Sequence, residues 1–503
     1  MEKEKIKPQE IEGEKIERIN VFDSTLQEMK DKMPPLRFSK FVHEFRKNKT
    51  VALYHSLTHQ VVYLSEELYQ ELKKEIDEKK TISEQHRRYT RELIDRGFLV
   101  SIGYEESEIL ERIREKHLGK PAFGILYLLL TDMCNLRCRY CYIEGAMPKN
   151  HIFSTMSKET AIKAINLFAK LISNNPKDRI IRHPIIIFYG GEPLLNKEVF
   201  LAALDEIDRL KKNSQLPSDL IISLVTNATL VDEEIVNAIV EKGVSVSVSL
   251  DGPKDIHDVN RIFINGKGTF QKVIKNLQWL QKAGAKVSVS CTISQTNLDK
   301  LEEVLKWLIS EFQIRSLGFN MLLDLPEITQ ANEDYARKAT EKLINCYQIA
   351  REIGVYEDRI MRKIKAFVGK SLHLVDCGGC GNQIVVTPDG KIGPCHAYMG
   401  SGKFFPTYID DKDFDYFHDP VFLEWSRRSP FNIPKCQFCS AIGLCGGGCP
   451  YNAELKFGNI WEVDPNFCLH TKIILEWLIW DLFDKTKTAA NVQSSAKRLD
   501  MGS

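Results

Sequence analysis

The sequence lacks any apolar run approaching the roughly 20 residues that a membrane-spanning helix requires. Its first residues, MEKEKIKPQEIEGEKIERIN, are densely charged and lack the apolar core of a secretory signal peptide. Net charge is also nearly absent, at +1, so nothing points to nucleic acid or to an anionic membrane surface. We therefore expect a cytoplasmic protein with no membrane and no nucleic-acid partner.

The chain has 503 residues, of which 43% are apolar and 27% charged, as in ordinary soluble globular proteins. This length exceeds what one hydrophobic core usually supports, so several folding units are expected. Thirteen cysteines are present, most of them at short, repeated spacings. In a reducing cytosol such clustering favours metal or cluster ligation over disulfides. Cys291 and Cys346 stand apart and are predicted to be core residues.

The N-terminal part divides into a charged extension, residues 1–35, and a small module, residues 36–105. The module begins with the β-prone runs FVHEF, TVALYH and QVVYLS. Two amphipathic helices follow, for which Ser65 and Ser83 are the expected N-caps, and then the short strand FLVSI. Strands, two helices and a returning strand predict a winged-helix module.

Beyond residue 120, apolar strands alternate with helices of about 12 residues, which is typical of a parallel sheet with crossover helices. The pattern predicts an α/β fold whose residues 120–330 form a partial (β/α)6 TIM-type barrel. A helical linker is expected over 331–376, a cysteine-rich domain over 377–485 and a polar tail over 486–503. The helix TKIILEWLIWDLF is too short to be a membrane anchor.

Three cysteines, Cys134, Cys138 and Cys141, lie in one loop directly after the strand ILYLLLT. The carboxyl end of a barrel strand is where barrel enzymes build active sites. Three thiolates within eight residues can hold one cubane iron–sulfur cluster and leave one iron without a protein ligand. The alternative is a zinc site, which normally takes four protein ligands, and no fourth Cys or His lies nearby.

This C-x3-C-x2-C loop, with Tyr140 before its last cysteine, resembles the hallmark of the radical S-adenosylmethionine (SAM) superfamily. Further matches follow at the ends of later strands. Gly190, Gly191 and Glu192, followed by Pro193, resemble the motif that grips the SAM amino group. The resemblance further implies that Ser249 and Asp251 lie beside the SAM ribose and that Arg261 binds the SAM carboxylate. The remaining expected SAM-site residues are Tyr140, Thr226 and Asn227.

The resemblance implies a [4Fe-4S] cluster on the three cysteines, with SAM bound at its open iron. One electron from the reduced cluster then breaks the C5′–S bond of SAM, and a 5′-deoxyadenosyl radical abstracts hydrogen from a substrate carbon. The cofactor supplies the difficult chemistry, while the protein positions and shields it. An external one-electron donor of the flavodoxin or ferredoxin type is therefore expected as a partner.

The C-terminal cysteines resemble the SPASM domain, which carries two auxiliary [4Fe-4S] clusters. The resemblance assigns Cys395 and Cys449, with Cys377 and Cys380, to an inner cluster. It assigns an outer cluster to Cys436, Cys439, Cys445 and Cys468. If Cys377 and Cys380 both bind, the inner cluster is closed and suits electron transfer. If only one binds, an iron stays open to a substrate thiolate. A pair of zinc sites is the alternative.

Residues 36 to 104 resemble the PqqD-like element that recognises the leader of ribosomally synthesised peptides. A leader would add to a sheet edge there as an extra strand. A DNA-binding winged helix is the alternative, which the near-neutral charge disfavours. We therefore expect a precursor peptide as the second partner.

Three functions stay open on the sequence alone. The first is a peptide maturase that forms a cross-link, with a Cys thioether favoured. The second is an anaerobic sulfatase-type maturase that makes formylglycine. His396 disfavours it, since sulfatase maturases of this layout carry an aspartate base at that position. The third is a non-catalytic iron–sulfur scaffold. No catalytic residue is assigned, although Glu144, Asp324, His373 and His396 are candidate bases.

Overall fold

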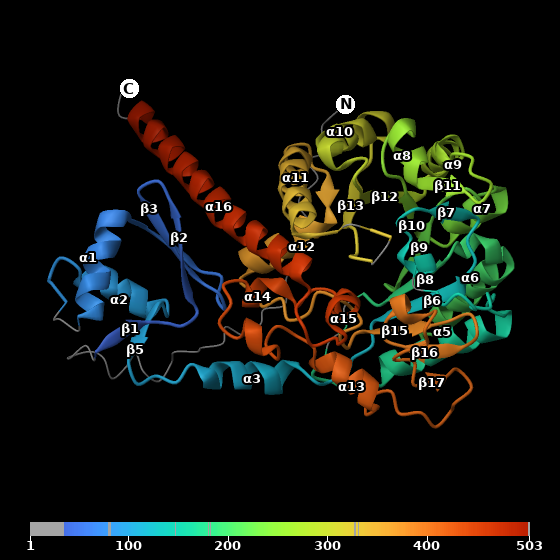
Figure 1. The fold of residues 1–503 in the computed structure, drawn as a ribbon, viewed down its shortest axis with the longest axis horizontal. Coiled ribbons are helices and arrows are strands. Elements are labelled where there is room, and N and C mark those ends of the chain that lie inside the picture. The colour runs from blue at the N-terminus through green and yellow to red at the C-terminus, as the bar shows by residue number, and fades with distance from the viewer. Residues whose placement is uncertain are drawn as a thin grey trace.

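The computed structural model describes residues 35–78, 82–145, 147–179, 181, 183–325, 328–329 and 331–500. The expected charged extension, residues 1–35, lies outside them except for its last residue. Figure 1 shows an N-terminal module at one end of the molecule, a large α/β part at the other, and loop-rich C-terminal segments between them.

The N-terminal module is built from two small antiparallel sheets. Strand β1 (Leu36–Phe38) pairs with β5 (Leu99–Ser101). The second sheet is a meander of β2 (Val42–Lys47), β3 (Thr50–His55) and β4 (Val61–Ser65), in that order. Its apolar side packs on α1 (Glu66–Asp77) and α2 (Arg87–Asp95) around a buried core that includes Leu53, Tyr69 and Leu93.

One of the two predicted helix caps of this module is present. Ser65 accepts a hydrogen bond from the amide of Leu68 and begins α1, as predicted. The prediction for Ser83 is wrong, because α2 begins only at Arg87 and the residue before it has no capping side chain. The Ser83 hydroxyl instead contacts the His86 ring, 2.9 Å away, and this local contact replaces a cap.

The large part is a mixed α/β fold around a parallel sheet, as predicted. Six strands lie side by side in chain order and run parallel: β6 (Ile125–Thr131), β8 (Ile185–Gly190), β9 (Ile221–Thr226), β10 (Ser245–Ser249), β12 (Lys286–Ile293) and β13 (Ser316–Met321). Strand β14 (Tyr356–Glu357) extends it beyond β13. Parallel strands that follow one another in the chain require crossover connections, so their carboxyl ends all lie at one edge of the sheet. The motifs at the ends of these strands therefore lie at that edge.

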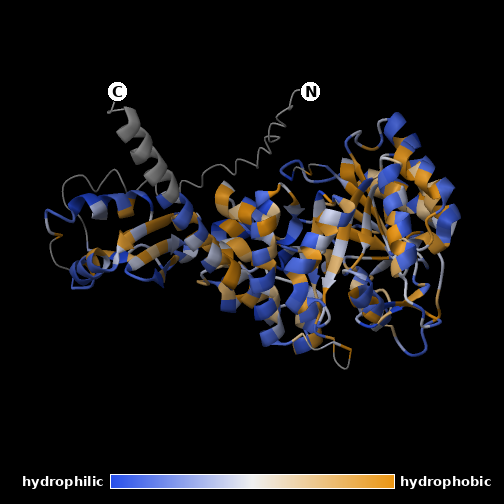
Figure 2. Ribbon diagram, turned by 90° about the horizontal axis from the view of Figure 1, so that it is seen from above, coloured by the Kyte–Doolittle hydropathy of each residue, from blue (hydrophilic) through white to orange (hydrophobic). Residues whose placement is uncertain are grey.

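The crossover helices bury the sheet. They are α5 (Lys158–Ser173), α6 (Lys197–Lys212), α7 (Glu233–Glu241), α8 (Lys254–Asn260), α9 (Phe270–Lys282) and α10 (Leu301–Phe312). Helices α11 (Glu333–Glu352) and α12 (Asp358–Gly369) occupy the expected helical linker. Figure 2 shows hydrophobic residues gathered where helices meet strands and hydrophilic ones on the outer surface. Cys291 and Cys346 are fully buried here, which confirms their assignment to the core.

The cysteine-rich segment is joined to the same sheet. Strand β15 (Gln383–Val386) pairs parallel with β6, and β16 (Lys391–Gly393) and β17 (Thr407–Tyr408) extend it antiparallel. Short helices follow: α13 (Pro420–Arg427), α14 (Ile442–Cys445) and α15 (Pro450–Phe457). The pairing of β15 with β6 brings Cys377 and Cys380 to the first strand of the sheet.

The last helix, α16 (Pro465–Asp500), contains TKIILEWLIWDLF and crosses from the C-terminal segments to the N-terminal module (Figure 1). It continues through residues 486–500, so most of the expected polar tail is part of this helix. The Tyr63 hydroxyl donates to the carbonyl of Ile479 at 2.6 Å and joins it to β4. In the described part of the chain, no helix combines the length and apolar character that crossing a membrane would take.

Candidate functional site

The three-cysteine loop is held against the sheet by a short strand pair. After β6 the chain passes through Cys134 into β7 (Leu136–Cys138), which pairs antiparallel with β11 (Arg261–Phe263). In this register Arg261 lies opposite Cys138. The pair therefore brings an arginine from the α8–α9 connection to the cysteine loop, although the two are far apart in sequence.

The three thiols lie close to one another. The pKa of Cys134 is raised to about 12, chiefly by burial and in addition by Glu192, Cys138 and Cys141. Burial likewise raises the pKa of Cys138 to about 11, while Arg261 lowers it. The Cys141 thiol pKa is raised by burial, too. Free thiols here stay protonated at neutral pH, so ligation of iron must release protons.

Gly190 and Gly191 lie directly against the backbone of the segment that leads into the cysteine loop. A Cβ on Gly191 would lie 2.1 Å from the Met133 carbonyl oxygen, and one on Gly190 would lie 2.2 Å from that of Thr131. The amides of Gly191 and Glu192 donate to the carbonyls of Thr131 and Met133, both at 2.9 Å. Both amides therefore bind the segment that precedes Cys134. The role of this motif at the SAM amino group stays a prediction.

The carboxylate of Glu192 is fully buried and joins two strand ends. It accepts hydrogen bonds from the Thr226 hydroxyl at 2.6 Å and the amides of Asn227 and Leu194 at 2.8 and 3.1 Å. Burial raises its pKa to about 7, and these three donors lower it. Asn227 in turn donates to Asn135 at 2.9 Å and lies 4.0 Å from the Cys134 sulfur. Glu192, Thr226 and Asn227 thus form one network behind the cysteine loop.

Tyr140, Asp251 and Arg261 form a second buried network. Asp251 has no exposed surface and accepts from the Tyr140 hydroxyl, from Arg261 Nε at 3.0 Å and from the Thr292 amide at 3.0 Å. The Arg261 guanidinium also lies 5.4 Å from the centre of the Tyr140 ring. Arg261 is therefore tied to Asp251, and Ser249, half-buried at the end of β10, lies two residues before that carboxylate.

Cys377, Cys380, Cys395 and Cys449 lie together, in the grouping expected for an inner cluster. Burial raises the pKa of Cys395 well above its usual value, and Cys377, Cys449 and Cys380 contribute to the shift. The pKa of Cys377 is raised to about 12 by burial and by Cys380. Cys377 and Cys380 both lie within this group.

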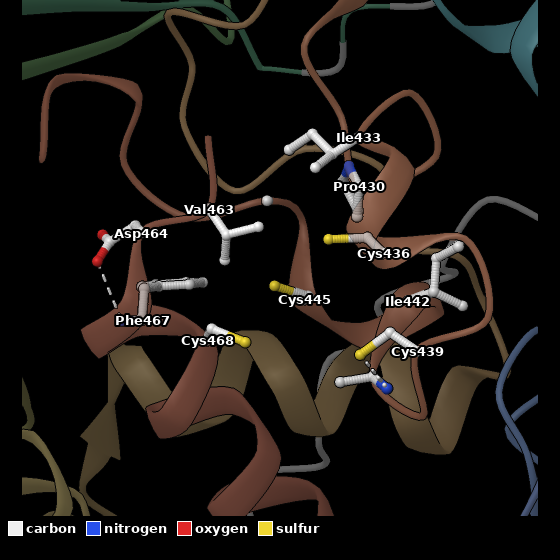
Figure 3. Close-up of a pocket in the computed structure, with 12 residues that line it drawn as sticks. Pro430, Ile433, Cys436, Cys439, Ile442, Cys445, Val463, Asp464, Phe467 and Cys468 are labelled. Carbon is white, nitrogen blue, oxygen red and sulfur yellow. Dashed lines mark hydrogen bonds between the residues drawn. The ribbon is translucent and has the colours of Figure 1, made fainter. Parts of the chain in front are cut away.

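Cys436, Cys439, Cys445 and Cys468 surround a second space. All four line one pocket, together with Ile433, Ile442, Val463 and Phe467 among others, and Figure 3 shows their sulfurs directed toward its centre. Burial raises the pKa of Cys436 to about 12, with Cys445, Cys439 and Cys468 adding to the shift.

The three sets consist of cysteine alone, and thiolate is the ligand that iron–sulfur clusters take. All thirteen cysteines are free thiols. Among the residues that the structure describes, no three Cys, His, Asp or Glu side chains converge closely enough for one metal ion. Zinc needs its ligands about 2.0–2.3 Å from a single ion. In a cubane, cysteines bind separate irons and stand further apart.

An aromatic cluster lies between the cysteine loop and the inner set. The His396 ring is 4.8 Å from that of Tyr127, 5.2 Å from Tyr189 and 6.0 Å from Tyr142. The hydroxyls of Tyr142 and Tyr189 are 2.9 Å apart. His396 Nδ1 is buried without a hydrogen-bond partner, and burial lowers the pKa of this ring to about 4.

The sequence reasoning missed these tyrosines. The available signal was a tyrosine in each of two otherwise apolar strands, ILYLLLT and IIIFYG. Of the four candidate bases, only His396 lies in this cluster. Glu144 is exposed near Arg137, Asp324 lies beside Lys456, and His373 contacts Asp376.

The N-terminal module is docked on the outer cysteine segment. The Phe41 and Phe438 rings are 5.4 Å apart, and Phe438 directly precedes Cys439. A Cβ on Gly443 would lie 2.3 Å from the carbonyl oxygen of Ser56, in the β3–β4 turn. The backbone of the N-terminal module therefore lies directly against the backbone of the outer cysteine segment.

Residues 128–308 match the model of the Radical SAM superfamily, within the region predicted to form the partial barrel. Members of this family use a [4Fe-4S] cluster and SAM. The chain is similar to the radical SAM cyclopropyl synthase TigE of Paramaledivibacter caminithermalis, with 24% identity over 77% of this chain and 81% of TigE. It is also similar to the cysteine-type anaerobic sulfatase-maturating enzyme of Clostridium perfringens, with 26% identity over 71% of this chain and 96% of that enzyme.

The fold is similar to that of Streptococcus suis SuiB, solved with the precursor peptide SuiA bound. The superposition has a TM-score of 0.51 and covers 86% of this chain and 99% of SuiB, at 14% identity. At this identity the likeness concerns the fold alone.

Proposed function

We propose that this radical SAM superfamily chain is a maturase that forms a cross-link, a Cys thioether, in a ribosomally synthesised peptide. The observation that carries the proposal is the gathering of eleven cysteines into one set beside the parallel sheet and two further sets, with the tyrosine and His396 cluster between the first two. A chain that only sensed iron would need neither the Arg261 network nor an enclosed aromatic site.

In this proposal three [4Fe-4S] clusters bind: one at Cys134, Cys138 and Cys141, and two at the auxiliary sets. Bound SAM and the first cluster supply the 5′-deoxyadenosyl radical that removes a substrate hydrogen. The residues around Glu192 fix the cysteine loop through the carbonyls of Thr131 and Met133. Arg261, held by Asp251, faces the loop with a positive charge that suits the SAM carboxylate.

The tyrosine and His396 cluster is proposed to receive the substrate side chain. Its rings provide apolar walls that exclude water, which a reactive carbon radical requires. The Tyr142 and Tyr189 hydroxyls and the unpartnered Nδ1 of His396 provide polar contacts within those walls. Burial lowers the pKa of His396 to about 4, so its ring stays neutral at pH 7 and its Nδ1 can form a hydrogen bond with a substrate group.

The N-terminal module is proposed to bind the leader of the precursor peptide. Strands β2 and β4 are the outer strands of its three-stranded sheet, and an edge strand can pair with an added peptide. The relatives support a protein or peptide substrate in general terms, since one matures sulfatases and SuiB was solved with its precursor peptide. An electron donor of the flavodoxin or ferredoxin type would reduce the clusters.

Sulfatase-type maturation to formylglycine is the second candidate, because 96% of a sulfatase-maturating enzyme is covered by this chain. His396 and the N-terminal module favour the peptide maturase. The test is anaerobic incubation of reconstituted protein with SAM, a reductant and the co-expressed precursor peptide. We expect 5′-deoxyadenosine and a peptide that has lost two hydrogens and its free thiols.

Other outcomes would replace this proposal. Conversion of a peptide cysteine to an aldehyde would favour the sulfatase-type reaction, and an unchanged mass with altered stereochemistry would indicate epimerisation. Absence of 5′-deoxyadenosine from protein with a full complement of iron would leave a non-catalytic leader-binding scaffold.

A further inference from the structure

Arg428, the residue after α13, is a cation buried between the two auxiliary cysteine sets. Its side chain has no exposed surface and is among the largest fully buried side chains of the protein. Arginine is rarely buried completely unless its charge is paired. The position of this charge therefore needs an explanation.

The guanidinium of Arg428 holds the backbone that connects the two sets. Its Nη1 donates to the carbonyls of Gly447 and Gly448, at 2.9 and 3.4 Å. These glycines lie between Cys445 of the outer set and Cys449 of the inner set. Nη2 donates to the carbonyl of Glu462 at 3.3 Å, and Nε donates to that of Ile460, on the segment leading to Cys468.

These carbonyls satisfy the donors of Arg428 but do not neutralise its charge. No salt bridge joins Arg428 to a carboxylate within the described ranges of the chain. Asp464 is the acid near it, but its oxygens accept from Asn452 Nδ2 and from the amides of Phe467 and Cys449. Lys363, the other buried cation here, differs in having Asp376 at 2.9 Å.

Ligand cysteines of both sets flank the backbone that Arg428 holds: Cys445 and Cys449 stand on either side of Gly447 and Gly448, and Cys468 follows the segment that contains Glu462. Burial raises the pKa of Cys380 to a net value of about 11, and Arg428 acts against this rise. It acts in the same direction on the pKa of Cys377 and Cys449, and on that of Cys436 in the outer set. A buried cation without an ion-pair partner is unfavourable, so an anionic cluster at each set would stabilise it.

We propose that Arg428 is the shared counter-charge of both auxiliary sites and raises the reduction potential of each cluster that they hold. Adding an electron to a cysteine-ligated cluster increases its negative charge, which a nearby buried cation favours. This inference rests on the proposed function, because it requires clusters at both sets. Arg428 is a positioning residue: it contacts ligand loops and ligands, and no substrate.

The test uses the full chain in which Cys134, Cys138 and Cys141 are replaced by alanine, so that only auxiliary clusters remain. In this background we compare Arg428, Arg428→Met and Arg428→Lys by iron content and by EPR-monitored redox titration. We expect Arg428→Met to lower the equilibrium constant for one-electron reduction of both clusters at least tenfold, which corresponds to about 59 mV. Arg428→Lys keeps the charge and is expected to stay within threefold of the parent.

Arg351→Met is the matched control. Arg351 pairs with Asp481, which lies 13 residues beyond Cys468 on α16, about 20 Å along the helix. We expect no change in either potential. A shift as large as that of Arg428→Met would show a general effect of removing a cation and would overturn the inference.

Unchanged potentials in iron-replete Arg428→Met, or a shift in only one cluster, would also overturn it. If Arg428→Met does not retain iron, Arg428→Lys decides. If Arg428→Lys has full iron content and parental reduction potentials, the result supports the role of the charge. If Arg428→Lys loses as much iron as Arg428→Met, the planar guanidinium matters and the charge alone does not. A parent with fewer than about eight irons overturns this inference together with the auxiliary clusters, and the iron content distinguishes that outcome from the others.

Discussion

Gly191→Ala tests whether the glycine motif holds the cysteine loop. The added methyl would lie 2.1 Å from the carbonyl oxygen of Met133 and 2.9 Å from that of Asp132. Separations under 3.0 Å are essentially never seen, so the end of β8 and the loop must part by about 0.9 Å. Both groups are backbone, so no flexible side chain can absorb the shift.

The magnitude follows from two contributions. Overpacking of this kind costs about 1–3 kcal/mol. The hydrogen bonds from Gly191 and Glu192 to Thr131 and Met133 would lengthen, and each contributes about 0.5–1.5 kcal/mol. We expect the free energy of unfolding to fall by about 2–6 kcal/mol and Cys134 to move away from Cys138 and Cys141.

Anaerobic reconstitution, iron content, and the change of the EPR spectrum on adding SAM are the measurements. Gly318→Ala is the control, since Gly318 lies in β13 and an added Cβ would meet only Asp358 Cβ at 3.9 Å. We expect Gly191→Ala to lose the SAM-dependent spectral change and Gly318→Ala to keep it. Parental stability and an intact SAM response in Gly191→Ala would refute the idea that Gly191 holds the cysteine loop in place.

Three further predictions test other parts of the site. Asp251→Asn leaves Arg261 buried without its counter-charge and should lower the free energy of unfolding by about 3–5 kcal/mol in urea titrations. The control Thr292→Val keeps the Thr292 amide that donates to Asp251 and should lower it by about 1 kcal/mol. Equal losses in the two variants would contradict this prediction. The pKa of Glu192 is about 7 in the fold against 4.5 when unfolded, so the folded state binds more protons between these values and stability should fall as pH rises from about 4.5 to 7. Glu192→Gln should flatten that slope in urea titrations at several pH values, and an unchanged slope would assign it to other groups. Gly443→Ala places a methyl 2.3 Å from the Ser56 carbonyl and should speed amide hydrogen exchange in residues 41–60 but not in β8; identical exchange would show that the module docks by other contacts.

Some of the site could be predicted because short spacings determine local geometry. Three cysteines within eight residues must lie in one loop, and the apolar strands with intervening helices indicated a parallel sheet. The cap at Ser65 followed from the same kind of local signal. The same local signal failed at Ser83, because the Ser83 hydroxyl contacts the ring of His86, three residues away, and does not cap the helix.

Other assignments depended on contacts between distant segments. Gly190, Gly191 and Glu192 resembled a motif that grips the SAM amino group, and only the fold shows that the two glycines also approach Thr131 and Met133. Asp251 and Arg261 were each expected at the SAM site. Their mutual pairing arises because β11 returns to β7 and places the guanidinium beside the carboxylate at the end of β10.

The sequence by itself determined the ligand chemistry of this protein, because the cysteine side chains and their close spacing are properties of the chain alone. The tertiary structure decided which groups share a site. It brought β15 beside β6, enclosed His396 with three tyrosines from other segments, and buried Arg428 between two cysteine sets. The effect of a charge on a neighbouring group depends on their distance and burial in three dimensions, and the order of the residues determines neither by itself.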